Sequence, residues 1–252
     1  MDLEDKFRHI RTQINSKLEN QKHLAIILEA VDENIREQQK ETKIEVIFNS
    51  SAVTNYLLSF LSILDQAVNQ ETREIKDLQL ATSALYLLDI IFQYTPKKLL
   101  RSKFVDLLTK IAPCITDENS EAPIIRSAIG CLESLLVAQD NKTWVNKEQL
   151  NINPMRGLNA ILELSLDGRP KIRKRSLDAL HKILSNPPPP MTEHIISKPI
   201  ADYSINALVT IVEENEKTQS KETSAMQIHI CKLYSTIIST NQWPTSKLDN
   251  LI

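Results

Sequence analysis

The chain has 252 residues, of which 42% are hydrophobic and 25% are charged, a composition that is ordinary for one or two soluble globular domains. It has 3 glycines, where average usage would give about 18, and this scarcity excludes glycine-rich phosphate loops and most tight β-hairpins. The net charge of −2 excludes a global positive field, so any contact with nucleic acid must come from a local basic patch.

Two apolar stripes at helical spacing open the chain. They consist of Phe7, Ile10, Ile14 and Leu18, and then of Leu24, Leu28, Val31 and Ile35. The stripes predict either a pair of helices or one long helix that docks on its neighbours. We expect residues 1–40 to cap the helices that follow, and residues 41–52 to form a polar linker.

The next segments are predicted helices over residues 53–68 and 74–94. The second of these is apolar nearly all round, which predicts burial between neighbours on both sides. Thr95 is expected to be an N-cap, with Pro96 as the first helical residue. This pair should open a helix over 97–112 that ends before Pro113.

A further centrally buried helix is predicted over residues 123–139. Asn153 followed by Pro154 repeats the N-cap and proline signal and predicts a helix over 154–166. Residues 170–185 then form another helix after a very short turn.

The four prolines at 187–190 cannot be helical and predict a rigid, exposed connector. Helices follow over residues 200–214 and 222–240. Trp243-Pro244-Thr245 has the pattern of one more helix start. We expect residues 191–252 to be further helical repeats, truncated at the C-terminal end.

Short helices in antiparallel pairs predict an all-α fold, a HEAT/armadillo-like helical-repeat solenoid. The strongest repeat signal runs from Asp167 to Arg173 and matches the HEAT second-helix pattern of aspartate, proline, aliphatic residue and arginine. A weaker copy starts at Pro123, and its distance from Pro170 is at the upper end of the period of about 40–47 residues. We expect residues 53–186 to consist of HEAT-like repeats.

The HEAT pattern also predicts contacts between repeats. Its turn aspartate and helix arginine bond across stacked repeats, so we predict a structural ladder made of Asp167, Arg173 and, from the weaker copy, Arg126. An apolar layer should be formed by Leu158, Ile161, Leu162, Leu177, Leu180 and Leu184.

No catalytic, cofactor-binding or metal site is expected, and the chain is predicted not to be an enzyme. No histidine has a second histidine at helical ligand spacing, and no serine lies in a GxSxG elbow. The cysteines Cys114, Cys131 and Cys231 lack CxxC spacing, so we interpret them as small core residues in a reducing compartment. The interrupted apolar run at residues 46–64 predicts no membrane span.

The charge pattern gives two candidate binding clusters. The first is a basic stripe on the helix that starts at Pro170, and it consists of Arg169, Lys171, Lys174, Arg175 and Lys182. The second consists of Lys97, Lys98 and Arg101. The first cluster is either a solvated helix face or a contact for phosphate groups or an acidic peptide on the concave surface that second helices form in such repeats. The second is either a solvated helix face or a contact for RNA or an acidic partner. With 5% aromatic residues, sequence-specific base recognition is not expected.

Several segments in order along residues 3–185 resemble the N-terminal region of the ribosomal RNA-processing protein twelve family. They are Lys17–Leu28, Tyr56–Ala67, Tyr94–Phe104, Lys110–Thr116, Ile129–Asp140 and Arg156–Arg175. Members of this family are large eukaryotic HEAT-repeat factors of ribosome biogenesis. Beyond the proline run the resemblance is weak.

The resemblance implies a non-catalytic scaffold in small-subunit biogenesis. Its implied partners are the 90S and pre-40S pre-ribosomal particles, pre-ribosomal RNA, ribosome assembly factors and the transport machinery, with a role in nuclear export. It implies a nucleolar and nuclear location with shuttling to the cytoplasm, and no homo-oligomer or membrane contact. The alternative is a nuclear transport receptor-like or generic HEAT adaptor that binds protein partners only.

Overall fold

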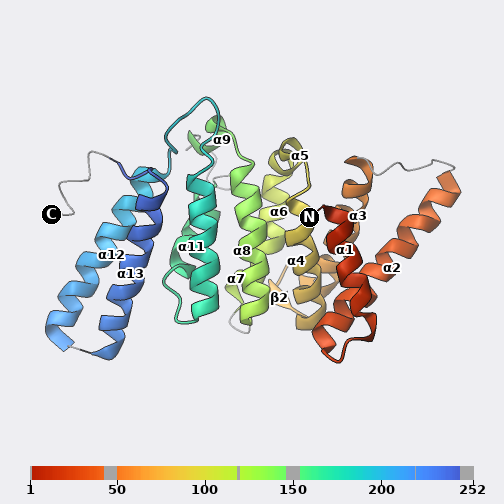
Figure 1. The fold of residues 1–252 in the computed structure, drawn as a ribbon, viewed down its shortest axis with the longest axis horizontal. Helices are drawn as coiled ribbons and strands as arrows, with labels where there is room; N and C mark the ends of the chain where they lie inside the picture. The colour runs from red at the N-terminus through yellow and green to blue at the C-terminus, as the bar shows by residue number, and fades with distance from the viewer. Residues whose placement is uncertain (1, 43–49, 118–119, 146–153, 219, 245–252) are drawn as a thin grey trace. The chain divides into compact units, whose positions relative to one another are not determined.

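The structure is a computed structural model that describes residues 2–42, 50–117, 120–145, 154–218 and 220–244. The described residues are predominantly α-helical and form two compact units, Met1–Leu135 and Leu136–Ile252 (Figure 1). The predicted linker therefore lies largely outside the described residues, and the predicted domain boundaries stay predictions.

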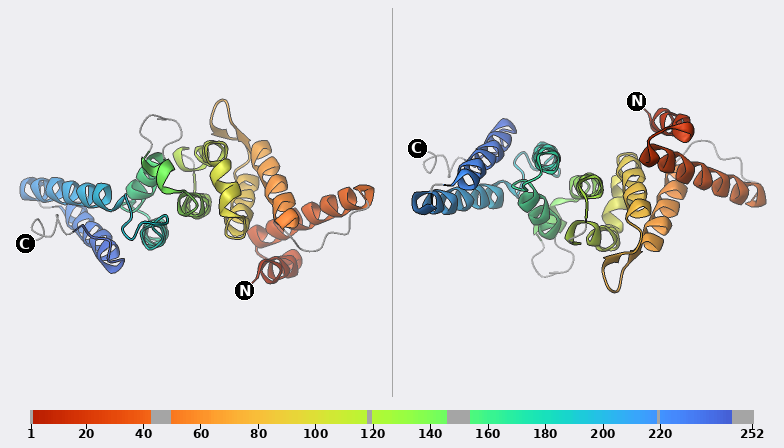
Figure 2. Two further views of the ribbon diagram at one scale, coloured as in Figure 1. Left: turned by 90° about the horizontal axis from the view of Figure 1, so that it is seen from above. Right: turned by 90° about the horizontal axis from the view of Figure 1, so that it is seen from below.

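The N-terminal unit begins with two helices, α1 (Leu3–Arg11) and α2 (Glu19–Thr42), joined by the short 3-10 helix Thr12–Asn15. The Asp2 carboxylate caps α1 by accepting a hydrogen bond from the Asp5 amide at 2.7 Å. The structure therefore has the helix pair rather than the single long helix. Both views of Figure 2 show the end of α2 extending away from α1.

The side chain of Phe7 fixes α1 on the unit. Its ring is fully buried and meets the rings of Tyr56, with 4.9 Å between centroids, and of Phe60, with 6.2 Å. Both partners lie on α3 (Ser50–Ala67), so the first apolar stripe is bound to a helix that is distant in sequence.

A buried polar network lies beside this aromatic contact. Arg11 donates from Nε to Asp32 Oδ2 at 2.7 Å and from Nη1 to Glu4 Oε1 at 2.8 Å. The hydroxyl of Tyr56 donates to Asp32 Oδ1 at 2.6 Å, and burial together with this bond raises the pKa of Tyr56. Asp32 therefore connects α1, α2 and α3 through one carboxylate.

A small hairpin follows α3 and was not predicted. Strands β1 (Val68–Asn69) and β2 (Glu74–Ile75) pair antiparallel, with Val68 opposite Ile75. The connecting turn contains no glycine: Asn69 Oδ1 accepts from the amides of two following residues, and Arg73 takes a φ of 60°. The predicted helix over 74–94 therefore starts later, at Leu78.

Helix α4 (Leu78–Phe92) is the centre of the N-terminal unit. Its Ala81, Ala84, Leu85, Leu88 and Ile91 side chains have no exposed surface, but Gln79 and Tyr86 are exposed, so the helix is largely buried rather than buried all round. It packs on α3, and α8 (Ala122–Val137) approaches it so closely that a Cβ on Gly130 would collide with Asp89. Here the absence of a side chain is what allows two helices to meet.

The predicted helix over 97–112 is wrong as a single element. It consists of α5 (Lys97–Ser102) and α6 (Phe104–Ile111), which meet at Lys103, and α7 (Pro113–Thr116) follows. Thr95 does not cap α5, because its buried hydroxyl donates to the carbonyl of Ile91 at 2.8 Å and so closes the end of α4.

The described residues of the C-terminal unit include a short helix that was not predicted, α9 (Asn141–Val145), and four longer ones. The longer helices are α10 (Met155–Leu164), α11 (Pro170–Leu184), α12 (Ser197–Thr218) and α13 (Lys221–Ser239). Helix α11 packs on both α10 and α13, and α12 pairs with α13. The predicted cap Asn153 lies outside the described residues, and the proline run at 187–190 is not helical.

His194 is buried between the proline run and α12. Its ring lies edge-on to Trp144, with 5.2 Å between centroids, and its Nδ1 accepts a hydrogen bond from the Ile196 amide at 3.3 Å. Burial lowers the pKa of His194 to about 4, because the imidazolium ion would lose its hydration there.

This buried histidine should make the C-terminal unit sensitive to acid. The unfolded chain takes up the proton near pH 6.5 and the folded chain only near 4, so stability is complete above about 6.5 and falls as the pH drops toward 4. We expect a loss of about 3 kcal/mol over this range, from a shift of this size. Urea denaturation at several pH values should show a shallower loss for His194→Phe, which keeps a ring against Trp144. Equal pH dependence in both proteins would contradict this assignment.

Candidate functional site

The turn before α11 holds its charged side chains in place. Arg169 donates from Nε and Nη2 to the two carboxylate oxygens of Asp167, at 2.9 and 2.8 Å, and its amide donates to Oδ1 at 2.7 Å. These bonds lower the pKa of Asp167. Arg169, a residue of the predicted basic stripe, therefore already forms a bidentate ion pair with Asp167.

The predicted ladder residues also make local contacts. Arg173 donates from Nη1 to the main-chain oxygens of Asp167 and Gly168, at 2.6 and 2.8 Å. It therefore closes its own turn through the backbone, while the Asp167 carboxylate is bound to Arg169. Arg126 donates from Nε to the carbonyl of Ala122 at 3.4 Å, within its own helix. A ladder between repeats stays a prediction.

Helix α11 places the remaining stripe residues at the surface. Its buried face is formed by Ile172, Ser176, Ala179, Leu180, Ile183 and Leu184. Lys171, Lys174 and Lys182 are exposed, Arg175 is half-buried, and the exposed face also carries Asp178. Leu177, predicted to face inward, is only half-buried.

The second predicted cluster lies in the N-terminal unit. Lys97 and Lys98 form the first turn of α5, Arg101 lies one turn further on, and all three are exposed. The two clusters belong to different compact units, so each is a separate candidate surface.

A polar cleft of about 420 Å³ lies between α11 and α13, within the C-terminal unit. Its lining is formed by Ser165, Pro170, Arg173, Lys174, Leu177, Asp178, His229, Lys232, Ser235 and Thr236. Of these residues, Lys174 belongs to the predicted basic stripe, and Arg173 was predicted as a ladder residue. The contributions of His229 and Lys232 were missed, because no sequence pattern says which face of α13 meets α11.

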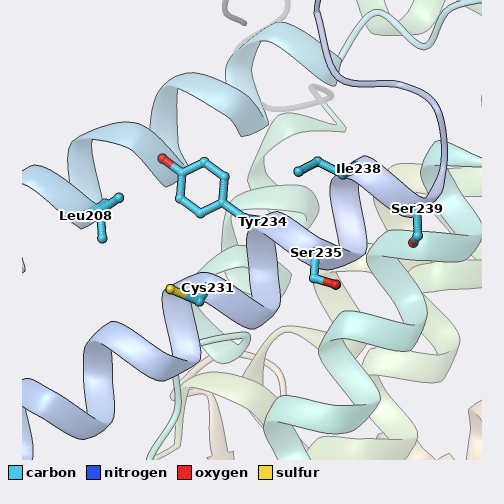
Figure 3. A pocket seen from close by; sticks show the side chains of 6 residues that line it. All are labelled: Leu208, Cys231, Tyr234, Ser235, Ile238 and Ser239. Atoms are coloured by element: carbon cyan, nitrogen blue, oxygen red, sulfur yellow. The ribbon is translucent and has the colours of Figure 1, made fainter. Parts of the chain in front are cut away.

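A second hollow, of about 570 Å³, is apolar and lies between α12 and α13 (Figure 3). Leu208, Tyr234 and Ile238 line it, together with the thiol of Cys231. Cys231 is exposed, so its prediction as a core residue is wrong, whereas Cys114 and Cys131 are buried.

The described ranges bear on two kinds of feature, clusters of metal-ligating side chains and membrane-spanning helices. In them, no three side chains of histidine, cysteine, aspartate or glutamate gather as metal ligands would. None of the helices drawn from these ranges combines the length and apolarity needed to cross a bilayer.

Comparison with known proteins identifies the family. Residues 5–240 match the family described as "RRP12-like, N-terminal HEAT repeats", and this match confirms the predicted all-α, HEAT-repeat fold class. The chain is 51% identical to "Ribosomal RNA-processing protein 12" of Saccharomyces cerevisiae over 100% of its length, and 24% identical to "Putative ribosomal RNA-processing protein 12" of Schizosaccharomyces pombe over 99%.

These alignments cover 21% and 20% of the two relatives, so the chain spans about one fifth of their length. The "RRP12-like protein" of Drosophila melanogaster is 25% identical over 71% of the chain and 11% of that protein. No solved structure matches. The chain belongs to the RRP12-like family and corresponds to its N-terminal HEAT repeats.

Proposed function

We propose that the chain is a non-catalytic scaffold in the biogenesis of the small ribosomal subunit. It binds pre-ribosomal RNA and assembly factors, acts in the nucleolus and nucleus, and supports the export of pre-ribosomal particles and their passage to the cytoplasm. The relative that is 51% identical is named a ribosomal RNA-processing protein, and this name supports a role in ribosome biogenesis. The observation that supports RNA contact is the exposed row of Lys171, Lys174 and Lys182 on α11.

We expect this chain to contact RNA through a local row of cationic side chains. The net charge of −2 provides no long-range attraction. Lysines on one helix face neutralise successive phosphates and release their counterions, which gives an affinity that falls steeply with salt. Low aromatic content leaves few stacking platforms, so the contact is to the backbone rather than to base edges.

A protein-only adaptor is the second candidate. The apolar hollow between α12 and α13 favours it, since exposed apolar surface of this kind is typical of protein contacts. The two candidates differ in whether salt-dependent RNA retention exists at all.

Charge reversal on α11 tests the proposal. The triple variant Lys171→Glu, Lys174→Glu, Arg175→Glu should weaken retention of single-stranded pre-ribosomal RNA. The slope of log affinity against log salt should become shallower by roughly 2, from about 0.7 per lost phosphate contact. RNA pull-down over a salt series measures both effects.

The matched control reverses three exposed lysines on α12 and α13, Lys198, Lys217 and Lys221. It applies the same change in net charge away from the α11 row, and circular dichroism checks that both variants fold. Absence of salt-dependent RNA retention by the wild-type chain, or equal losses in both triple variants, would favour the protein-only adaptor.

A further inference from the structure

The cleft between α11 and α13 collects cationic groups from two helices. Arg173 and Lys174 come from α11, and Lys232 comes from α13. Asp178 is the carboxylate in the lining, so three cations face one anion, with the imidazole of His229 among them. The lowered pKa of His229, caused by burial and by the charges of Arg173 and Lys232, keeps that ring neutral at pH 7.

Several hydrogen-bond donors in the cleft remain available to a ligand. Arg173 uses Nη1 on the two backbone oxygens of its turn, which fixes the guanidinium and leaves Nε and Nη2. The hydroxyls of Ser165 and Thr236 are not among these donors, because they already donate to the carbonyls of Leu162 and Lys232. The ammonium groups of Lys174 and Lys232 are mobile point charges on exposed side chains.

An orphaned nitrogen lies in the same lining. His229 Nδ1 is buried and has no hydrogen-bond partner among the described residues. Buried polar nitrogens without partners are uncommon and call for an explanation such as an absent ligand or water. The volume of about 420 Å³ is within the range of roughly 300–1,000 Å³ that ligand sites occupy.

We propose that this cleft holds a backbone phosphate of single-stranded RNA, between Arg173 and Lys174 of α11 and Lys232 of α13. The inference rests on the proposed function and assigns the RNA contact to a particular place. A fixed guanidinium beside two ammonium groups is suited to a phosphate dianion or diester.

The position of Lys174 favours RNA over a phosphorylated peptide. Lys174 belongs both to the cleft and to the exposed row that includes Lys171 one turn before it. A polymer with a charge on every unit can occupy the cleft and continue along this row, whereas a single phosphorylated side chain would use the cleft alone. The phosphopeptide is therefore an outcome of the test.

Reversal of Lys232 tests the cleft without touching the α11 row or the turn that Arg173 closes. Lys232→Glu should weaken binding of single-stranded RNA about fivefold at 0.1 M salt and make the salt slope shallower by about 0.7, the share of one phosphate. Lys232→Arg should retain binding. Lys221→Glu is the matched control, since it is an exposed lysine on the same helix outside the cleft.

Nuclear magnetic resonance of the His229 imidazole, assigned with His229→Asn, gives a second readout. A phosphate in the cleft should raise the pKa of His229, because its negative charge offsets Arg173, Lys174 and Lys232 while Asp178 is unchanged. The imidazole titration is recorded with and without saturating RNA, and in Lys232→Glu the RNA-induced rise should be lost.

The outcomes separate the two proposals. Suppose that the wild-type chain binds RNA, that Lys232→Glu binds it as Lys221→Glu does, and that RNA does not change the pKa of His229. The assignment of the RNA contact to the cleft is then wrong, and the proposed function is retained. If the wild-type chain binds no RNA, both fail. If a phosphoserine peptide displaces RNA and alone raises the pKa of His229 to the same extent, the cleft is a peptide site and the RNA assignment is overturned.

Discussion

Replacing Phe7 with alanine should lower the free energy of unfolding of the N-terminal unit by about 3–5 kcal/mol, the usual cost of removing a buried phenylalanine ring. The ring has no exposed surface and contacts Tyr56 and Phe60, and the guanidinium carbon of Arg11 lies 6.0 Å from its centre. Its loss therefore leaves a cavity at the contact between α1 and α3. Urea denaturation followed by circular dichroism measures the change.

Two substitutions control for this effect. Phe7→Leu keeps most of the volume but loses the aromatic edge contacts, so it should cost less than about 1.5 kcal/mol. Ile26→Ala removes a side chain of α2 that is 45% exposed, and it should change stability by only about 0.5 kcal/mol. A Phe7→Ala cost as small as that of Ile26→Ala would show that α1 does not depend on this ring for its packing.

Replacing Arg11 with alanine should destabilise the same unit by about 3 kcal/mol, because it removes the cation from a buried carboxylate. The side chain of Asp32 is 5% exposed, and without Arg11 it keeps only the hydroxyl of Tyr56 among the partners described above. The exposed pair of Arg8 and Asp5 offers the contrast: it is solvated on both sides, so Arg8→Ala should cost less than about 1 kcal/mol. Chemical denaturation of the two variants under one buffer measures the difference.

A double variant separates the buried charge from simple loss of packing. Asp32→Asn removes the charge that Arg11 neutralises, so adding it to Arg11→Ala should cost less than the sum of the two single changes. If the two losses in unfolding free energy add strictly, the side chains of Arg11 and Asp32 do not stabilise each other. Such additivity would leave the hydrogen bond from Tyr56 as the interaction that holds Asp32.

The sequence predicted α11 almost to the residue, and the reason is local. Pro170 fixes the start of the helix, and the apolar positions Ile172, Leu180 and Ile183 recur at helical spacing along one face. Exposure of Lys171 and Lys174 follows from the same periodicity. These features depend on neighbours within one or two turns, so the pattern alone determines them.

The failures share a tertiary cause. Thr95 looks like a cap for the following helix, but in the structure it is buried and its hydroxyl completes α4. The hairpin of Val68–Asn69 and Glu74–Ile75 depends on an asparagine side chain and a left-handed Arg73, neither of which carries a strong sequence signal. For Thr95, burial of the side chain favours the bond to α4 over the predicted cap of the following helix.

The candidate site divides in the same way. The basic row on α11 could be predicted, whereas the cleft could not, because Lys232 and His229 approach Arg173 only when α13 packs on α11. The Asp167 carboxylate likewise had two arginines within reach, and the folded turn pairs it with Arg169 while Arg173 binds the backbone.

By itself the sequence determined that this protein is built from amphipathic helices, which of them are buried most completely, and which helix carries an exposed basic row. Those properties follow from periodicity and capping, which act over a few residues. Only the tertiary structure decided where helices break, which carboxylate meets which arginine, and which face of α13 completes the cleft. Such choices depend on the competition among partners that chain folding brings together from distant positions, and no local pattern encodes its outcome.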